Sequence, residues 1–419
     1  MEKKKVIIVG GGFAGIELAN KLCKSNLFEV TLIDKNNYHQ FQPLFYQVAT
    51  SGLEPSSISF PLRKLFQNKN LKIRVAEVTK IDSNNKIIKT TIGDFSYDYI
   101  VIAIGADTNY FGMQNIEKYG YPMKSTTEAM QLRNKLLQNL EDSLTAKNEE
   151  EKNALLNIVI VGGGPTGVEV AGTLAEMKKH VLPKDYPEIN FSEMKIFLIE
   201  AAPKTLNVMS EVSAKKSQEY LEKLGVKVLC STQVKDYDGN FVLLGSGEKV
   251  NTKTLIWAAG VKANKINGLP ESVYGKGGRL KVNQNNLLLN SDCIFALGDC
   301  AIMESEKYPN GHPQMAQPAI QQGKLLAKNL ISLEQNLPLK EFQFKDLGSM
   351  ATIGRNLAVV DLPWIKFQGF FAWLVWMFLH LMSILGVKNK LLVFINWLWN
   401  YVTYDQSLRL ILKTKEKKE

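Results

Sequence analysis

Two glycine-rich loops, each placed directly after an apolar run, constrain this sequence more than any other feature. Residues 157–172 read NIVIVGGGPTGVEVAG, with Gly162, Gly164 and Gly167 at G-x-G-x-x-G spacing. A strand that turns sharply into a helix needs this pattern, because the first glycine forms the turn, the second admits a pyrophosphate and the third packs helix against strand. The helix N-terminus then offers unpaired N–H groups to the phosphates. The stretch therefore predicts a dinucleotide site.

A second copy of the loop stands at the start of the chain. Residues 5–15 read KVIIVGGGFAG, with Gly10, Gly12 and Gly15 at the same spacing. The strand EVTLID then ends at Asp34, about twenty residues further on, where a carboxylate grips the ribose hydroxyls. The alternative, an acidic residue that merely closes a strand, is weaker in this context.

The segments after each loop repeat as well. The strand FSYDYIVIAIGA runs into Gly105, and the strand TLIWAAG runs into Gly260. Shorter strands precede each of these, and LKIRVAEVTKID at 71–82 is expected as one of them. Two βαβ units at an offset of about 150 residues are an internal repeat. We expect an α/β fold with two Rossmann-like dinucleotide-binding domains and a C-terminal helical region.

The second copy departs from the pattern in one respect. Glu200 lies 33 residues beyond Gly167, because KKHVLPKDYPEINFSEM intervenes, which predicts an extended helix or an added loop. The ribose role of Glu200 therefore rests on the strand KIFLIE before it. A carboxylate there would repel a 2′-phosphate and favour NADH over NADPH.

Other polar residues have two readings each. Glu169 lies in the first turns of the second loop's helix, as a dipole-stabilised residue or as a functional carboxylate. Gln317 and Gln321 share one helix face, where solvation is the simplest explanation. The strand CIFALGDCA ends at Gly298 and Asp299. Residues 39–55 contain aromatics, Gln, Thr and Pro, and either line a cofactor or form a surface loop.

The charge, the N-terminal sequence and the cysteines limit the cellular location and the kinds of partner that we expect. The formal net charge is +10, partly from a tail that includes Arg409, Lys413, Lys415, Lys417 and Lys418. No segment resembles a nucleic-acid module, so a membrane surface is the expected partner of this charge. No signal peptide is recognised before the first loop, and we therefore expect that domain in the cytoplasm. The four cysteines form no C-x-x-C pair, and neither a dithiol nor a metal site is expected.

The C-terminal region contains the most apolar stretch. Residues 369–387, between Lys366 and Lys388, have no formal charge, and residues 391–402 hold Trp397, Trp399 and Tyr401. A spanning helix, a helix pair within one leaflet, and a buried core or dimer face are the alternatives. Cationic flanks and interfacial aromatics favour monotopic attachment to the cytoplasmic face of the cell membrane.

Two dinucleotide sites imply FAD and a nicotinamide, between which a hydride passes. Disulfide oxidoreductases of this fold hand the electrons to a dithiol, which this chain lacks. The apolar tail points instead to a lipid-soluble quinone as the acceptor.

The motifs GGGFAG, GGGPTGVEVAG, WAAG, ALGDCA and AQPAIQ, in this order, resemble the type II NADH dehydrogenases, which are non-proton-pumping NADH:quinone oxidoreductases of the two-dinucleotide flavoprotein superfamily. The likeness runs from about Lys5 to Leu330. It implies one non-covalently bound FAD per chain and NADH as co-substrate. It also implies a discontinuous FAD-binding domain (1–118 and 270–345), an inserted NADH-binding domain (119–269) and a membrane-attachment region (346–419).

The resemblance also implies roles for individual residues. Glu169 would sit near the nicotinamide and the quinone, where it binds substrate or relays a proton, and Gln317 and Gln321 would border the flavin and the quinone tunnel. The implied FAD-binding residues are Gly10, Gly11, Gly12, Phe13, Ala14, Gly15, Asp34, Lys35, Val78 and Asp299, with Ala316 bordering the flavin and the quinone tunnel. The implied NADH-binding residues are Gly162, Gly164, Gly167 and Glu200, and Gly105, Gly260 and Gly298 are further cofactor-binding residues.

Two rival functions stay open at this point. A sulfide:quinone oxidoreductase has a similar fold and membrane habit but needs reactive cysteines near the flavin. An NADH-sensing flavoprotein would bind the same cofactors without meaningful turnover. The choice between ubiquinone and menaquinone, and the existence of a homodimer, are also left open by the sequence.

Overall fold

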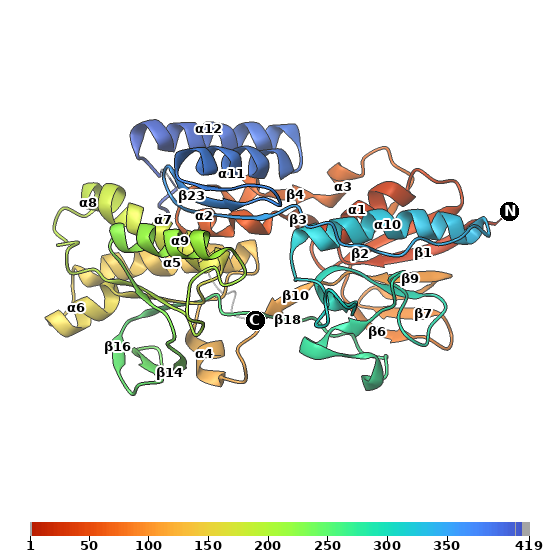
Figure 1. Cartoon of the computed structure of the whole chain (residues 1–419), viewed down its shortest axis with the longest axis horizontal. Coiled ribbons are helices and arrows are strands. Elements are labelled where there is room, and N and C mark those ends of the chain that lie inside the picture. The colour runs from red at the N-terminus through yellow and green to blue at the C-terminus, as the bar shows by residue number, and fades with distance from the viewer. Residues whose placement is uncertain (1, 407, 413–419) are drawn as a thin grey trace. The chain divides into compact units, whose positions relative to one another are not determined.

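The computed structural model describes residues 2–406 and 408–412, which form two compact units (Figure 1). Unit 1 comprises Met1–His39, Phe60–Asp107 and Val261–Leu347. Unit 2 comprises Gln40–Ser59, Thr108–Gly260 and Gly348–Glu419. Each unit contains one of the glycine loops and its own parallel sheet.

Unit 1 is built on a five-stranded parallel sheet in the order β20-β9-β1-β2-β5. Its strands are β1 (Lys4–Val9), β2 (Phe28–Asp34), β5 (Lys72–Val75), β9 (Tyr99–Ile102) and β20 (Ile294–Ala296). The strand interiors are apolar and buried, as both faces of a parallel sheet require. Helices α1 (Phe13–Leu22) and α10 (Ala316–Glu334) lie against each other, since a Cβ on Gly323 would approach the Ala14 carbonyl oxygen to 2.7 Å.

The rest of unit 1 is a strand insert and short elements. The antiparallel sheet β6-β7-β8 contains β6 (Val78–Asp82), β7 (Ile87–Thr90) and β8 (Gly93–Ser96). The prediction of one strand over 71–82 is therefore wrong, because β5 and β6 belong to different sheets. The remaining elements are α3 (Leu62–Leu65), β18 (Val261–Ala263), η4 (Glu271–Val273), η5 (Lys276–Gly278), β19 (Leu280–Lys281), η6 (Gly298–Cys300) and β21 (Ala301–Ile302). Three short strands include the points of the sequence at which one unit ends and the other begins: β3 (Tyr38–Gln40), β4 (Ser59–Pro61) and β10 (Ala106–Thr108).

Unit 2 repeats the plan with a four-stranded parallel sheet in the order β13-β12-β11-β17. These strands are β11 (Ile158–Val161), β12 (Ile196–Ile199), β13 (Val226–Leu229) and β17 (Thr254–Trp257), and an antiparallel insert holds β14 (Val234–Tyr237), β15 (Phe241–Leu244) and β16 (Lys249–Asn251). Its helices before the C-terminal region are η1 (Gln42–Leu44), α2 (Phe45–Ala49), η2 (Pro55–Ser57), α4 (Gln114–Tyr119), α5 (Thr126–Ser143), α6 (Glu149–Leu156), α7 (Pro165–Glu176), the π-helix η3 (Met177–Val181), α8 (Leu182–Asp185) and α9 (Glu211–Lys223). The predicted α/β repeat is confirmed.

The C-terminal region adds an antiparallel sheet and a helix pair to unit 2. The sheet contains β22 (Ser349–Gly354), β23 (Leu357–Asp361) and β24 (Lys366–Gln368), and the helices are α11 (Phe370–Ser383) and α12 (Val387–Thr403). The apolar run 369–387 is not one helix, because α11 ends before Gly386, whose φ of +80° starts the turn into α12. Among the helices of the described residues, none is long and apolar enough to cross a membrane. The basic residues Lys413, Lys415, Lys417 and Lys418 lie outside the described residues.

Candidate functional site: two nucleotide loops and a buried carboxylate

The loop of unit 1 needs glycine at two of its three positions for packing. Gly10 has φ of +108°, and a Cβ there would lie 2.3 Å from the Ala103 carbonyl oxygen. A Cβ on Gly15 would lie 1.9 Å from the Gly10 carbonyl oxygen. A Cβ on Gly12 would meet no atom within 4 Å, although Gly12 caps the start of α1. The second glycine therefore faces open space beside a helix N-terminus, which fits a pyrophosphate.

The loop of unit 2 has the same geometry. Gly162 has φ of +111° with its Cβ position 2.5 Å from the Ala258 carbonyl oxygen, and that of Gly167 is 1.8 Å from the Gly162 carbonyl oxygen. Gly164 again faces open space at the start of α7. Both loops therefore suit the phosphates of a dinucleotide.

The two strand-end carboxylates occupy equivalent places. Val9 pairs with Ile33 and Val161 pairs with Ile199, so Asp34 and Glu200 stand at the same register. Asp34 accepts a hydrogen bond from the Gly11 N–H at 2.6 Å, and Glu200 accepts one from the Gly163 N–H. The insertion before Glu200 forms η3, α8 and a loop, and so it lengthens the connection without moving the carboxylate.

A turn at Gly298 gathers further predicted residues of unit 1. Gly298 has φ of +68°, and its Cβ position lies 3.2 Å from the Ala319 Cβ and 3.6 Å from the Ala14 Cβ. The turn is held from the next helix, because the buried Gln322 accepts a hydrogen bond from the Gly298 N–H at 2.7 Å. Asp299 therefore lies where the starts of α1 and α10 meet, and those starts carry the predicted residues Phe13, Ala14 and Ala316.

The other predicted FAD residues of unit 1 lie around this loop or at the sheet edge. The Phe13 ring packs edge-on against His39 at 5.1 Å, and His39 Nδ1 lies 3.1 Å from the Gly11 carbonyl oxygen. Lys35 is exposed directly after Asp34, and the half-buried Val78 begins β6. Gly105 follows β9 with φ of +69°, and in unit 2 Gly260 follows β17 with φ of +142°.

Gln317 and Gln321 are half-buried and bind backbone. The Gln317 side chain accepts a hydrogen bond from the Leu347 N–H at 3.1 Å. Gln321 accepts one from the Lys345 N–H at 3.0 Å and donates one to the Lys345 carbonyl oxygen at 2.8 Å. The predicted shared helix face is confirmed, and its amides hold the segment 345–347 instead of being solvated freely.

Glu169 is the most unusual titratable residue near the second loop. Its side chain, on α7, is only 7% exposed, and burial raises the pKa of Glu169 to about 8. The Thr352 N–H, which approaches a carboxylate oxygen to 3.4 Å, and the Trp376 indole oppose this pKa shift only in part. Helix α7 lies so tightly under β22 that a Cβ on Gly172 would come within 1.5 Å of the Ile353 carbonyl oxygen. This burial favours the neutral, protonated form of the Glu169 carboxyl group near neutral pH.

The segment 39–55 is largely helical and buried, so the surface-loop alternative is wrong. Elements η1 and α2 bury Leu44, Phe45 and Tyr46 almost completely. The charge of Glu169 adds to burial in raising the pKa of Tyr46, which places the phenol near that carboxylate. Gln47 links the segment to the C-terminal helices, because it donates to the Tyr46 hydroxyl at 2.9 Å and accepts from the Trp397 indole at 2.7 Å.

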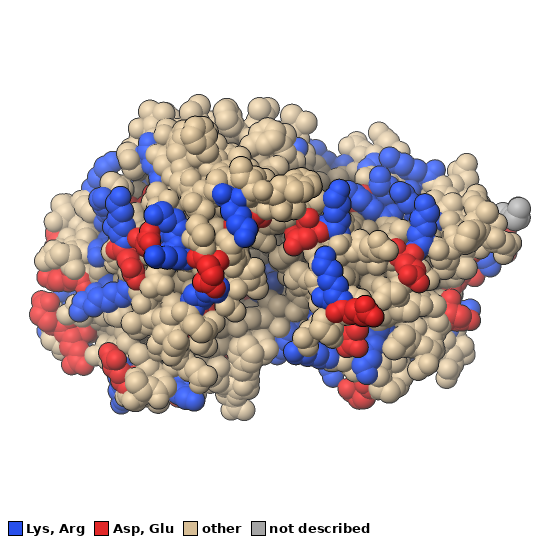
Figure 2. All heavy atoms as spheres, in the orientation of Figure 1, with Lys and Arg blue, Asp and Glu red and all other residues tan. Residues whose placement is uncertain are grey.

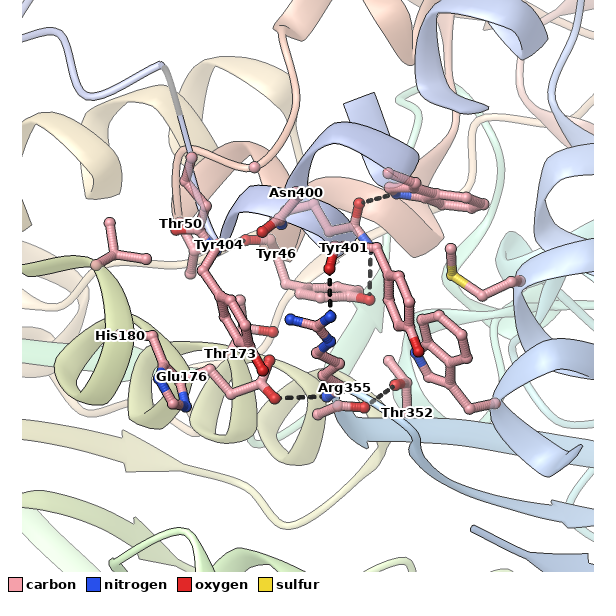
Figure 3. A pocket seen from close by; sticks show the side chains of 18 of the residues that line it. Tyr46, Thr50, Thr173, Glu176, His180, Thr352, Arg355, Asn400, Tyr401 and Tyr404 are labelled. Carbon is pink, nitrogen blue, oxygen red and sulfur yellow. Dashed lines mark hydrogen bonds between the residues drawn. The ribbon is translucent and has the colours of Figure 1, made fainter. Parts of the chain in front are cut away.

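A cavity in unit 2 is lined by residues that neighbour Glu169, among them Thr173 and Thr352 (Figure 3). Its walls come from α2, α7, η3, β22, α11, α12 and the residues after α12. Three side chains near Glu169, those of Tyr46, Thr352 and Trp376, line it, and so does Thr173, whose hydroxyl donates to the Glu169 carbonyl oxygen at 2.8 Å. Further along the cavity lie Glu176 and His180.

Arg355 is the central cation of this cavity (Figure 3). Its guanidinium lies between the rings of Tyr401 and Tyr404, 4.0 and 3.9 Å from their centroids, and donates to the Tyr401 carbonyl oxygen. Its backbone N–H donates to Glu176 at 2.6 Å. Burial raises the pKa of Glu176, whereas Arg355 acts in the opposite direction.

Sequence reasoning found Glu169 but missed most of its surroundings. Tyr46 lies in a segment whose helical pattern is interrupted by Pro43, and Thr352 and Trp376 come from a region more than 180 residues away. Glu176 offered one usable signal, because it stands seven residues after Glu169 and so near the same helix face.

Comparison with known proteins agrees with this geometry. The family model described as pyridine nucleotide-disulphide oxidoreductase matches residues 4–323, and the one described as NDH2 C-terminal domain matches residues 347–403. The chain is 31% identical over 411 residues to the type II NADH:quinone oxidoreductase Ndh of Mycobacterium tuberculosis, covering 94% of this chain and 87% of the relative. It is 30% identical over 362 residues to the type II NADH:quinone oxidoreductase of Staphylococcus saprophyticus, covering 85% and 89%.

Solved structures show the same fold. The structure of NDH2 from Plasmodium falciparum in complex with NADH matches with a TM-score of 0.89 at 23% identity, covering 98% of this chain and 100% of that one. The sulfide:quinone oxidoreductase of Aquifex aeolicus matches with a TM-score of 0.74 at 19% identity, covering 95% of each chain. On its family matches and its identity to these relatives, the chain belongs to the type II NADH:quinone oxidoreductases of the pyridine nucleotide-disulphide oxidoreductase superfamily.

Proposed function

We propose that this chain binds FAD in unit 1 and NADH at the second glycine loop, and that Glu169 supplies a proton to the quinone. The chain is an NADH:quinone oxidoreductase and a flavoprotein by family. The reaction NADH + H⁺ + quinone → NAD⁺ + quinol balances with one proton taken from solution. The chain must therefore conduct a proton as well as electrons.

The residues of unit 1 fit FAD. Gly10 to Gly15 would hold the pyrophosphate, Asp34 with Lys35 the adenosine ribose, and Asp299 the ribityl–phosphate region. Val78 would lie by the adenine, and Gly105, Gly298 and Ala316 would complete the walls. When bound, FAD takes the hydride of NADH and releases two electrons to the quinone. The open space at Gly12 and the Asp34–Gly11 hydrogen bond support this proposal.

The residues of unit 2 fit NADH. Gly162, Gly164 and Gly167 would hold its pyrophosphate, Glu200 the ribose hydroxyls and Gly260 the nicotinamide side. Glu200 also repels the 2′-phosphate of NADPH. Its hydrogen bond to the Gly163 N–H keeps its carboxylate facing the loop.

Burial of Glu169 is the single observation that carries the proton proposal. A carboxylic acid with a pKa of about 8 is largely protonated near neutral pH, and a general acid works best when its pKa lies near the working pH. The dipole-stabilised alternative requires an ionised carboxylate at the helix start, which this burial disfavours. We also propose that the start of α10 borders the quinone and the flavin, through the side chains of Ala316, Gln317 and Gln321.

The acceptor side is proposed to meet a membrane at α11 and α12. Phe371, Phe378 and Val402 are 74%, 61% and 70% exposed, and the surface over these helices is nearly free of charged side chains in Figure 2. A surface that gathers exposed large apolar side chains in this way marks a contact with a membrane or another protein. Peripheral attachment to the cytoplasmic face would let a quinone move from the lipid to the enzyme.

The rival activity with sulfide lacks a suitable cysteine among the described residues. Burial raises the pKa of Cys300 to about 11, and its Sγ donates to the Leu297 carbonyl oxygen at 3.2 Å. Burial also raises the pKa of Cys23, Cys230 and Cys293. These pKa shifts disfavour the thiolate form that attacks sulfur in all four cysteines.

The test is steady-state turnover of the full chain with a short-chain quinone and NADH, NADPH or sulfide as donor. Fast turnover with NADH, slower turnover with NADPH and none with sulfide are expected. In Glu169→Gln, kcat should fall about 100-fold, at the low end of general acid catalysis. Glu188→Gln, on the exposed surface of unit 2, is the matched control. Flavin reduction without quinone-dependent turnover would favour the NADH-sensing alternative.

A further inference from the structure

Glu169 needs a route to water, since its own side chain is buried. The cavity of Figure 3 reaches its immediate neighbours Tyr46, Thr352 and Trp376. The cavity leaves about 100 Å³ for water, and one buried water needs roughly 10–15 Å³ on this measure. Several waters therefore fit in the cavity beside the residues that neighbour Glu169.

Side chains that can bind or pass a proton, two of them titratable, follow one another along the cavity wall formed by α7 and η3. Thr173, Glu176 and His180, all on α7 and η3, line it in sequence after Glu169. The π-helix η3 begins directly after Glu176 and contains His180, and a π-turn within an α-helix is frequently found at a functional site. His180 is only partly buried and follows the exposed Lys179, so the wall leads from the buried carboxyl group toward solvent.

We propose that this cavity is the proton inlet of the enzyme, with His180 as its outer group, Glu176 as the intermediate carrier and water beside Thr173 as the link to Glu169. Protons would pass from solution to His180, then to Glu176, and through water to Glu169, which passes one to the quinone. Each transfer breaks one bond to hydrogen and forms another, and no oxidant or reductant is needed. The proposal rests on the proposed role of Glu169 and extends it.

The charges around the inlet suit such a relay. Burial raises the pKa of Glu176, and Arg355 and Lys179 oppose that rise in part. Burial lowers the pKa of His180, and the nearby cations Lys179, Arg355 and Lys184 lower it further. From α2 the neutral Tyr46 faces Glu169, and from the end of α12 Tyr404 packs on His180 at 4.6 Å. The raised pKa of Glu176 favours its protonated form more than in a free carboxyl group, and the lowered pKa of His180 keeps the imidazole mainly neutral near pH 7, able to accept a proton.

The alternative occupant of the cavity is the quinone itself, since Trp373, Trp376 and Trp397 form part of its wall. The two readings differ kinetically. A relay residue affects the rate of proton delivery and therefore kcat, whereas a residue that contacts the quinone affects its KM.

The test measures reoxidation of the NADH-reduced full-length enzyme by a short-chain quinone, between pH 6 and 9, in Glu176→Gln and His180→Gln. Glutamine keeps the acceptor for the Arg355 N–H, so the fold should persist, and bleaching of the flavin by NADH should be unchanged. Reoxidation should slow about 10-fold in Glu176→Gln. Its rate should then fall about 10-fold per pH unit, because hydronium must deliver the proton directly.

Two further arms separate a relay from a structural role. Added imidazole should restore much of the rate in His180→Gln, and Glu176→Asp should retain more activity than Glu176→Gln, whereas Glu188→Gln should match the unmodified enzyme. A rise in quinone KM with unchanged kcat, or an unaltered pH profile without imidazole rescue, would overturn the inlet. A normal rate in Glu169→Gln would instead overturn the proposed function on which it rests.

Discussion

The ionisation of Glu169 should make the folded protein less stable as the pH rises. The folded-state pKa is about 8, against an ordinary value of 4.5. Between these values the folded chain holds a proton that the unfolded chain has lost, so stability falls by about 1.36 kcal/mol per pH unit. The loss is absent below pH 4.5, reaches about 3.4 kcal/mol at pH 7 and levels near 5 kcal/mol above pH 8.

Glu169→Gln removes this term while keeping the size and shape of the side chain. The variant should have nearly the same stability as the unmodified protein at pH 5, and its advantage over the unmodified protein should grow as the pH rises. For unfolding of all 419 residues, the entropy is about 0.9 kcal/mol per degree, so 3.4 kcal/mol corresponds to a gain of about 4 °C in Tm at pH 7.

Calorimetry or intrinsic tryptophan fluorescence at pH 5, 7 and 9 measures the difference. Glu188→Gln, which alters an exposed carboxylate, should show no such trend. If the melting temperatures of Glu169→Gln and the unmodified chain stay parallel from pH 5 to 9, Glu169 is not a buried, protonated acid, and the argument for its role fails.

Three other perturbations follow from the structure. Gly172→Ala forces a methyl group into the Ile353 carbonyl and should lower Tm by several degrees or abolish folding, as thermal melting would show; a Tm within 1 °C of the original would contradict that packing. Glu200→Ser removes the charge that repels a 2′-phosphate, and should raise the NADPH/NADH ratio of kcat/KM about 10-fold, whereas an unchanged ratio would remove Glu200 from the ribose site. Replacing Phe371 and Phe378 together by Asp should release the protein from anionic vesicles in a sedimentation assay, and full retention would place the membrane contact elsewhere.

The repeat and its loops could be predicted because their constraints are local. In each unit a Cβ at the first glycine, Gly10 or Gly162, would collide with the carbonyl group directly after the neighbouring strand. Only glycine fits there, so the turn can be recognised from the sequence. The register of Glu200 was also predictable, because strand pairing places it opposite the loop whatever the insertion adds.

The surroundings of Glu169 could not be predicted in the same way. Tyr46, Thr352 and Trp376 come from three distant segments, and only tertiary packing brings them to one wall. The helix 45–49 was missed because Pro43 and the short length of α2 hide its period. The uncharged run 369–387 was treated as one segment, although a positive φ at Gly386 divides it.

The most direct test of the central claim is single-turnover reoxidation by quinone in Glu169→Gln, mixed anaerobically after reduction with NADH. We predict that NADH bleaches the flavin at the normal rate in this variant and that quinone restores the absorbance about 100-fold more slowly than in the unmodified chain. Equal rates of reoxidation in the two proteins would show that the proton reaches the quinone by another residue.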